Sequence, residues 1–202
     1  GQNLALTGPK TLASGDTDLA AGATWELPAS VGSGGTNKDN VNTSNTWDTS
    51  NYNIVQIRTG STSLSGWKNG YGNYYSWPAA TAGTGTTSVV GKDATASICP
   101  KGWKLPTYSG DYSFSTLTGT KSGWATGVTF NGVSGNSGYY FGSTKTTVYK
   151  GANFWPAAGY YLGSLDAGTY GNYWSRRAYS DTNSAYDLYF ASSGVRPQNR
   201  SG

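Results

Sequence analysis

Ile98-Cys-Pro-Lys-Gly-Trp-Lys-Leu-Pro-Thr107 is the most specific segment of the chain, because it joins the single cysteine, two prolines and a tryptophan within ten residues. The pattern predicts a strand that enters a core, with Trp103 and Leu105 inside. A lone cysteine is most often a small buried apolar residue, which makes Cys99 structural. The alternative is that Cys99 forms half of a disulfide whose partner lies outside this chain.

The composition around this segment predicts one folded, loop-rich domain with an aromatic core. The chain has 202 residues, the size of one ordinary domain. Leu, Ile, Val and Phe are few, but there are 16 Tyr and 8 Trp and the net charge is only +4, which argues against disorder. Each buried aromatic side chain removes roughly 150–250 Å² from water, so a modest number can replace many aliphatic residues.

Several function classes are excluded or disfavoured. The chain has no His and one Cys, so it can build neither a Ser-His-Asp triad nor a zinc ribbon. Glu26 is the only glutamate and no two carboxylates form an obvious acid–base pair, so we expect no enzyme, no metal and no cofactor. Lys and Arg are thinly spread, so nucleic-acid binding is not expected. The sequence has no long apolar run, so no membrane span is expected in it.

The local patterns predict short strands and little helix. Residues 1–50 read as a loop-rich N-terminal part, and residues 51–202 as the core. Strands are expected at 51–58, 71–77, 139–141, 146–149, 154–161 and 186–190. In the last of these, Tyr186, Leu188 and Phe190 share one face at period two. One helical turn is expected at 114–117.

Further segments accompany the cysteine segment in a fixed order along the chain: Gln2-Asn-Leu-Ala-Leu6, Tyr71-Gly-Asn-Tyr-Tyr-Ser-Trp77, Ala79-Ala-Thr-Ala-Gly83, Phe154-Trp-Pro-Ala-Ala-Gly-Tyr160, Gly171-Asn-Tyr-Trp-Ser175, Ala185-Tyr-Asp-Leu-Tyr-Phe190 and Val195-Arg-Pro197. Together they resemble the Fibrobacter succinogenes major paralogous domain family of bacterial secreted and surface proteins. The resemblance implies one α+β domain over 1–202, mostly β and loop, with a C-type-lectin-like fold. It also implies an extracellular or cell-surface location, with the signal or anchor outside this chain.

The resemblance implies that both ends of the domain are trimmed. The family usually closes with a Gly-Phe-Ser-Val-Arg-Cys strand, and that missing cysteine is the expected partner of Cys99. The tripeptides with which C-type lectins hold calcium do not occur here, so calcium-dependent sugar binding is not expected. The aromatic and aliphatic residues expected to have structural roles, together with the cysteine, are Cys99, Trp103, Trp155, Trp174, Leu188 and Phe190.

The C-terminal third is the candidate ligand face. It is rich in Tyr, Arg, Asn and Ser, the residue types of adaptable binding surfaces. Similar domains are the variable proteins of diversity-generating retroelements, whose ligand face lies in this part. By that resemblance the exposed contact set is Arg176, Arg177, Tyr179, Asp181, Asn183, Asp187, Tyr189, Arg196, Gln198, Asn199 and Arg200. The alternative interpretation is an ordinary solvated surface with the tyrosines partly packed.

The sequence therefore predicts a non-catalytic binding or display module on a bacterial surface, which recognises a protein or glycan of another cell or host. The alternative is a structural subunit of a cell-surface fibre or sheath, whose open edges are completed by a neighbouring copy.

Overall fold

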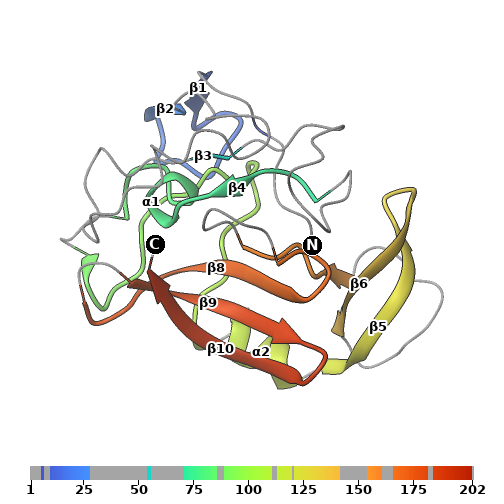
Figure 1. Cartoon of the computed structure of the whole chain (residues 1–202). Helices are drawn as coiled ribbons and strands as arrows, with labels where there is room; N and C mark the ends of the chain where they lie inside the picture. Colours follow the sequence, from blue (N-terminus) through green and yellow to red (C-terminus); the bar gives the residue numbers. More distant parts are fainter. Residues whose placement is uncertain are drawn as a thin grey trace.

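The computed structural model describes residues 6, 10–27, 54–55, 71–85, 89–110, 113–119, 121–141, 154–160, 166–181 and 184–201 (Figure 1). They form small antiparallel sheets with little helix, which confirms the mostly-β class. The elements are β1 (Lys10–Ala13), β2 (Thr24–Leu27), β3 (Ile54–Val55), β4 (Tyr74–Tyr75), α1 (Trp77–Ala80), α2 (Phe114–Gly119), β5 (Lys121–Phe130), β6 (Val133–Phe141), β7 (Phe154–Pro156), β8 (Tyr170–Ala178), β9 (Ser184–Ala191) and β10 (Gly194–Ser201). No helix in this described part is long and apolar enough to cross a membrane.

The C-terminal sheet, with strand order β10-β9-β8, lies between two packed clusters. Because side chains alternate along a strand, β9 sends Leu188 and Phe190 to one face and Ala185 to the other. Leu188 and Phe190 are fully buried against side chains of α2, β6 and β8. On the opposite face, Ala185 packs with Trp77 of α1 and Trp174 of β8. The sheet is thus covered on both sides over part of its area.

Aromatic rings dominate the cluster around Phe190. The Tyr173 ring stacks on it at 5.8 Å, and the rings of Phe141 and Tyr139 lie at 5.9 and 6.1 Å. Trp155 of β7 extends the cluster, with its ring 5.8 Å from that of Phe141. The expectation from composition, an aromatic core, agrees with this packing.

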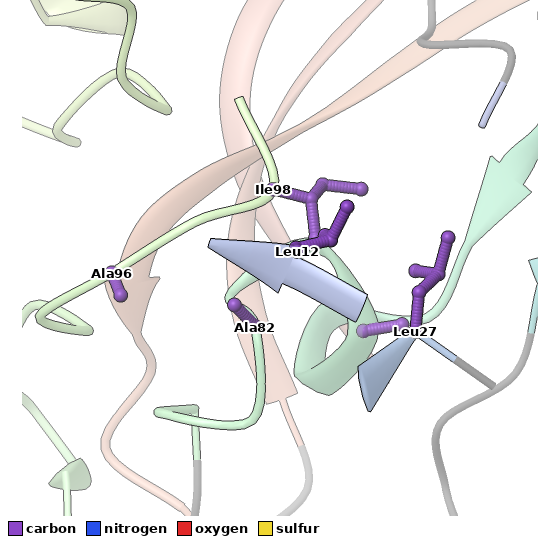
Figure 2. Packing of buried hydrophobic residues seen from close by; sticks show 6 residues of the cluster. Leu12, Leu27, Ala82, Ala96 and Ile98 are labelled. Atoms are coloured by element: carbon purple, nitrogen blue, oxygen red, sulfur yellow. The ribbon is translucent and has the colours of Figure 1, made fainter. Parts of the chain in front are cut away.

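A smaller aliphatic cluster lies among β1, β2, α1 and the start of the 98–107 segment (Figure 2). Leu12 of β1 and Leu27 of β2 meet Ile98 and Ala82 there, all of them buried. A hydrogen bond from the Ile98 amide to the Ala80 carbonyl, 3.1 Å long, joins the 98–107 segment to the end of α1.

The prediction of a buried strand at 98–107 is wrong. Beyond Ile98 the chain makes a tight turn, in which the Trp103 amide donates to the Pro100 carbonyl at 2.9 Å and Gly102 has φ +84°. A positive φ at the third position is typical of a type II turn, and glycine adopts it without strain. The turn directs Trp103 into solvent, where it is 72% exposed, and Leu105 is only half-buried.

The other predicted elements agree in part. The helical turn at 114–117 lies within α2, and the strand at 186–190 lies within β9. The strand at 71–77 is shorter, because the Ser76 side chain caps α1, where Pro78 fits the first turn. The strand at 154–161 ends at Pro156. Of the strand at 51–58 only β3 is described, and 146–149 lies outside the described residues.

The β5–β6 hairpin was not predicted as a unit, since only 139–141 was assigned to a strand. Its turn is Asn131-Gly132, and both residues have positive φ, +49° and +76°. Asn-Gly between two strands is the strongest short-range hairpin signal. This dipeptide could therefore have revealed the hairpin from the sequence.

Candidate binding face on the C-terminal sheet

Three polar or aromatic side chains form a row across the C-terminal sheet. Asn172 of β8 pairs with Tyr189 of β9, and Tyr189 pairs with Arg196 of β10. Residues directly opposite in neighbouring strands point to the same face, so the three side chains lie side by side. Tyr170 lies two residues before Asn172 in β8 and shares this face. We call these four residues the Tyr189 face.

The Tyr189 ring is the centre of this face. The Arg196 guanidinium carbon lies 5.2 Å from the Tyr189 ring centroid, a cation–π distance. The Tyr170 ring lies 5.6 Å from the Tyr189 ring, with 33° between their planes. Both tyrosines are half-buried and Arg196 is exposed. Two aromatic rings and a cation are therefore presented together on a sheet, which holds them in fixed register.

Arg196 forms no ion pair within the described part of the chain, where the pair between Arg177 and Asp93 is the one found. A guanidinium carries five N–H donors in its plane and no acceptor. Such an arginine can accept a planar anion on its edge.

The amide of Asn172 lies buried beside these groups. Neither its Nδ2 nor its Oδ1 has a hydrogen-bond partner among the described residues. An unpaired buried polar group costs about 1–3 kcal/mol, and native proteins contain few of them. Because Asn172 is in the same row as Tyr189, its unpaired amide marks this part of the sheet as a candidate binding site.

Two of the predicted contact residues instead hold the 89–94 segment on β8. The Arg176 Nε donates to the Ala94 carbonyl at 2.9 Å, and the Arg177 Nη1 lies 3.3 Å from the Asp93 carboxylate. The two side chains of that ion pair are 41% and 39% exposed, so solvent screens the pair and it contributes little to stability. The backbone bond from the Ala94 amide to the Arg176 carbonyl, at 2.8 Å, is the firmer link.

A second aromatic group lies near the end of β8 and the start of β9. The rings of Tyr108 and Tyr186 stack at 3.8 Å, and the Tyr179 ring meets Tyr186 edge-on at 5.2 Å. Partial burial, and then the neighbouring Tyr108 and Tyr179, raise the pKa of Tyr186, whereas Arg177 lowers it. The rings mainly contact one another. Of the three, sequence reasoning proposed only Tyr179 as a contact residue.

The structure corrects one predicted contact residue and leaves others undescribed. Asp187 is 1% exposed and so does not belong to an exposed contact set. It pairs in register with Trp174 on the partly covered face of the sheet. Asp181 and Gln198 are half-buried. Asn183, and the side chains of Asn199 and Arg200 in β10, lie outside the described residues.

Residues expected to have structural roles occupy different environments. Trp174 is half-buried and its Nε1 donates to the Tyr75 carbonyl at 2.8 Å, which joins β8 to β4. Cys99 is a free, half-buried cysteine, and burial raises the pKa of its thiol. Trp103 is the exception described above, since it is exposed.

Tyr170 was missed as a contact candidate. The alternation along the strand could have identified it. Tyr170 and Asn172 point to the same face of β8, opposite to Tyr173, which packs into the core.

A shallow depression beside β1 offers no comparable site. Its lining includes Ser14, Thr17, Asp18 and Lys101. The Ser14 hydroxyl accepts from the Gly22 amide, and the Thr17 hydroxyl donates to the Ala13 carbonyl. Asp18 accepts from Ser97. The Ser14 and Thr17 hydroxyls thus serve local turns, and the Asp18–Ser97 bond joins segments 79 residues apart. Within the described residues no three acidic or cysteine side chains gather as metal ligands.

Comparisons with family models, with curated proteins and with solved structures found no match to this chain.

Proposed function

We propose that this chain is a non-catalytic binding or display module with a C-type-lectin-like fold, located outside a bacterial cell. Its Tyr189 face contacts a protein or glycan on another cell or host surface. The segments that resemble the Fibrobacter succinogenes family, which occur in a fixed order along the chain, support this location. The small antiparallel sheets with little helix agree with such a fold without being specific to it.

The observation that carries the proposal is the exposed Arg196 over the Tyr189 ring, with Tyr170 beside it. Tyrosine supplies rigid contact area at low entropic cost, and arginine supplies a planar fork of donors. The side chains rise from three hydrogen-bonded strands above a packed aromatic cluster, so little ordering is needed when a ligand binds.

The proposed contact set differs from the one expected from sequence. Tyr189, Arg196 and Gln198 remain in it, and Tyr170 and Asn172 are added. Arg176 and Arg177 are assigned to holding the 89–94 segment.

Attachment to cells tests this proposal. Purified protein carrying Arg196→Ala and Tyr189→Ala should lose attachment to cells that the parent protein binds. Lys121→Ala is the matched control, because Lys121 is an exposed cation on β5, in another sheet. Unchanged attachment of the double variant would place the contact surface elsewhere.

The alternative, a fibre or sheath subunit, rests on β10, which lies at the edge of the described C-terminal sheet. An edge strand can pair with a strand from a neighbouring copy. Pro197 stands in the middle of β10 and has no N–H, which interrupts such a ladder. We therefore place this function second. Electron microscopy of native material decides between them, since ordered filaments would favour the subunit.

A further inference from the structure

We propose that the Tyr189 face binds an acidic polysaccharide whose sugar rings carry carboxylate groups. This inference rests on the proposed function of the same face and names its ligand class.

Arg196 supplies the carboxylate site. Arg196 is exposed, its guanidinium carbon lies 5.2 Å from the Tyr189 ring centroid, and it pairs with no carboxylate among the described residues. Its in-plane N–H groups match the two oxygens of a carboxylate. Asp187, the acidic residue on the same face of β9, is buried.

The Tyr170 ring, beside Tyr189, supplies the sugar site. Tyr170 and Tyr189 are half-exposed, with their centroids 5.6 Å apart and their planes tilted by 33°. The negative face of an aromatic ring attracts the positive C–H groups on the flat side of a pyranose. A sugar on the Tyr170 ring would have its substituents near Arg196, which lies over the neighbouring Tyr189 ring.

An acidic peptide fits this place less well. The site is on the face of the sheet, where the main-chain groups of β8, β9 and β10 already pair with one another. A peptide that binds a sheet usually adds a strand at its edge, where main-chain donors and acceptors are open. The outer strand carries Pro197, which removes one donor. A polysaccharide brings its own hydroxyl groups and needs no such ladder.

Charge favours an anionic ligand. The chain has a net charge of +4, so an acidic polymer is attracted at long range and held at Arg196. If long-range attraction alone held the ligand, removal of any single cation would weaken binding equally. The proposed site instead predicts that binding depends on Arg196.

Binding to purified polysaccharides tests the proposal. The probes are polygalacturonate, the same polymer with its carboxyl groups methyl-esterified, neutral dextran, dextran sulfate and polyglutamate. Biolayer interferometry should show binding to polygalacturonate, and esterification should weaken it by about tenfold or more, the effect of one charge-assisted contact. Arg196→Ala should cause a loss of similar size.

The variants separate geometry from charge. Arg196→Lys keeps the charge but loses the planar fork, so it should bind several-fold more weakly than the parent protein. Lys121→Ala, the matched control, should bind like the parent protein. Equal losses for Lys121→Ala and Arg196→Ala, or equal binding to dextran sulfate, would overturn the proposal in favour of unspecific attraction of polyanions.

Two further outcomes would refute the ligand class and not the binding function. If cell attachment depends on Arg196 but polygalacturonate does not bind, the ligand is not a carboxylated polysaccharide. If polyglutamate binds as tightly as polygalacturonate, the face recognises acidic peptide. If neither attachment nor polysaccharide binding depends on Arg196, the proposed function fails as well.

Discussion

Gly171→Ala tests the packing beneath the candidate face. Gly171 of β8 pairs with Phe190 of β9, and the Phe190 ring lies over it. A Cβ at Gly171 would overlap three carbons of that ring, the farthest of them only 2.5 Å away. Real Cβ atoms essentially never come within 3.0 Å of a neighbour, so the ring would have to move.

The ring has little room to move. Tyr173 stacks on it at 5.8 Å, with 14° between the planes, and Phe141 lies 5.9 Å away. Overpacking a core by one methyl group typically costs about 1–3 kcal/mol. The reduced freedom of the unfolded chain offsets about 0.4–1 kcal/mol of this. We therefore expect Gly171→Ala to lower the free energy of unfolding by about 1–2 kcal/mol.

Urea unfolding followed by circular dichroism measures this change as a lower midpoint at unchanged slope. Gly15→Ala is the control, because a Cβ at Gly15 has no atom within 4 Å and its φ is not in the left-handed region. It should leave the midpoint unchanged or raise it slightly. If Gly171→Ala agreed with Gly15→Ala within about 0.5 kcal/mol, the packing argument would be refuted. Phe190→Leu should cost less stability in the Gly171→Ala background than in the parent chain, because it removes the clashing ring.

Three other predictions concern burial. Trp103→Ala should change the free energy of unfolding by less than about 0.5 kcal/mol, because Trp103 is 72% exposed, whereas Trp77→Ala should cost about 3–5 kcal/mol; equal losses in thermal unfolding would contradict this. Asn172→Leu should be neutral or stabilise by about 1 kcal/mol, since it removes unpaired buried polar atoms, and a loss above about 2 kcal/mol in urea would show that the amide is paired. Burial raises the pKa of Tyr71 and Tyr75 from 10.0 to about 12, so the unfolded chain loses these protons first. Stability should be constant just below pH 10 and fall between pH 10 and 12, and urea midpoints that stay flat across this range would disprove the assignment.

Several features could be predicted because their signals are local. The alternation in 186–190 placed Leu188 and Phe190 on one face, and both are fully buried. The Asn131-Gly132 dipeptide is an equally local signal for a hairpin turn, which the predicted strands did not include.

The prediction for Trp103 was wrong for a reason that local pattern does not reveal. An apolar residue between prolines is compatible with a strand or a turn, and the turn that Gly102 permits reverses the chain. Asp187 shows the complementary case. Its polar character predicts exposure, but this stretch of the sheet is covered on both faces.

By itself the sequence determined the class of the protein, which is small β elements around an aromatic core. It also contains no His and a single Cys, the residue types on which the common catalytic and metal sites depend. These properties follow from composition and from alternation within a strand. Only the tertiary structure decided which rings are covered. The Trp77 Nε1 donates to Ser175, 98 residues away, and the Trp174 Nε1 donates to Tyr75, 99 residues away. Exposure of a side chain depends on which distant segment packs over it, and residue spacing within one strand carries no such information.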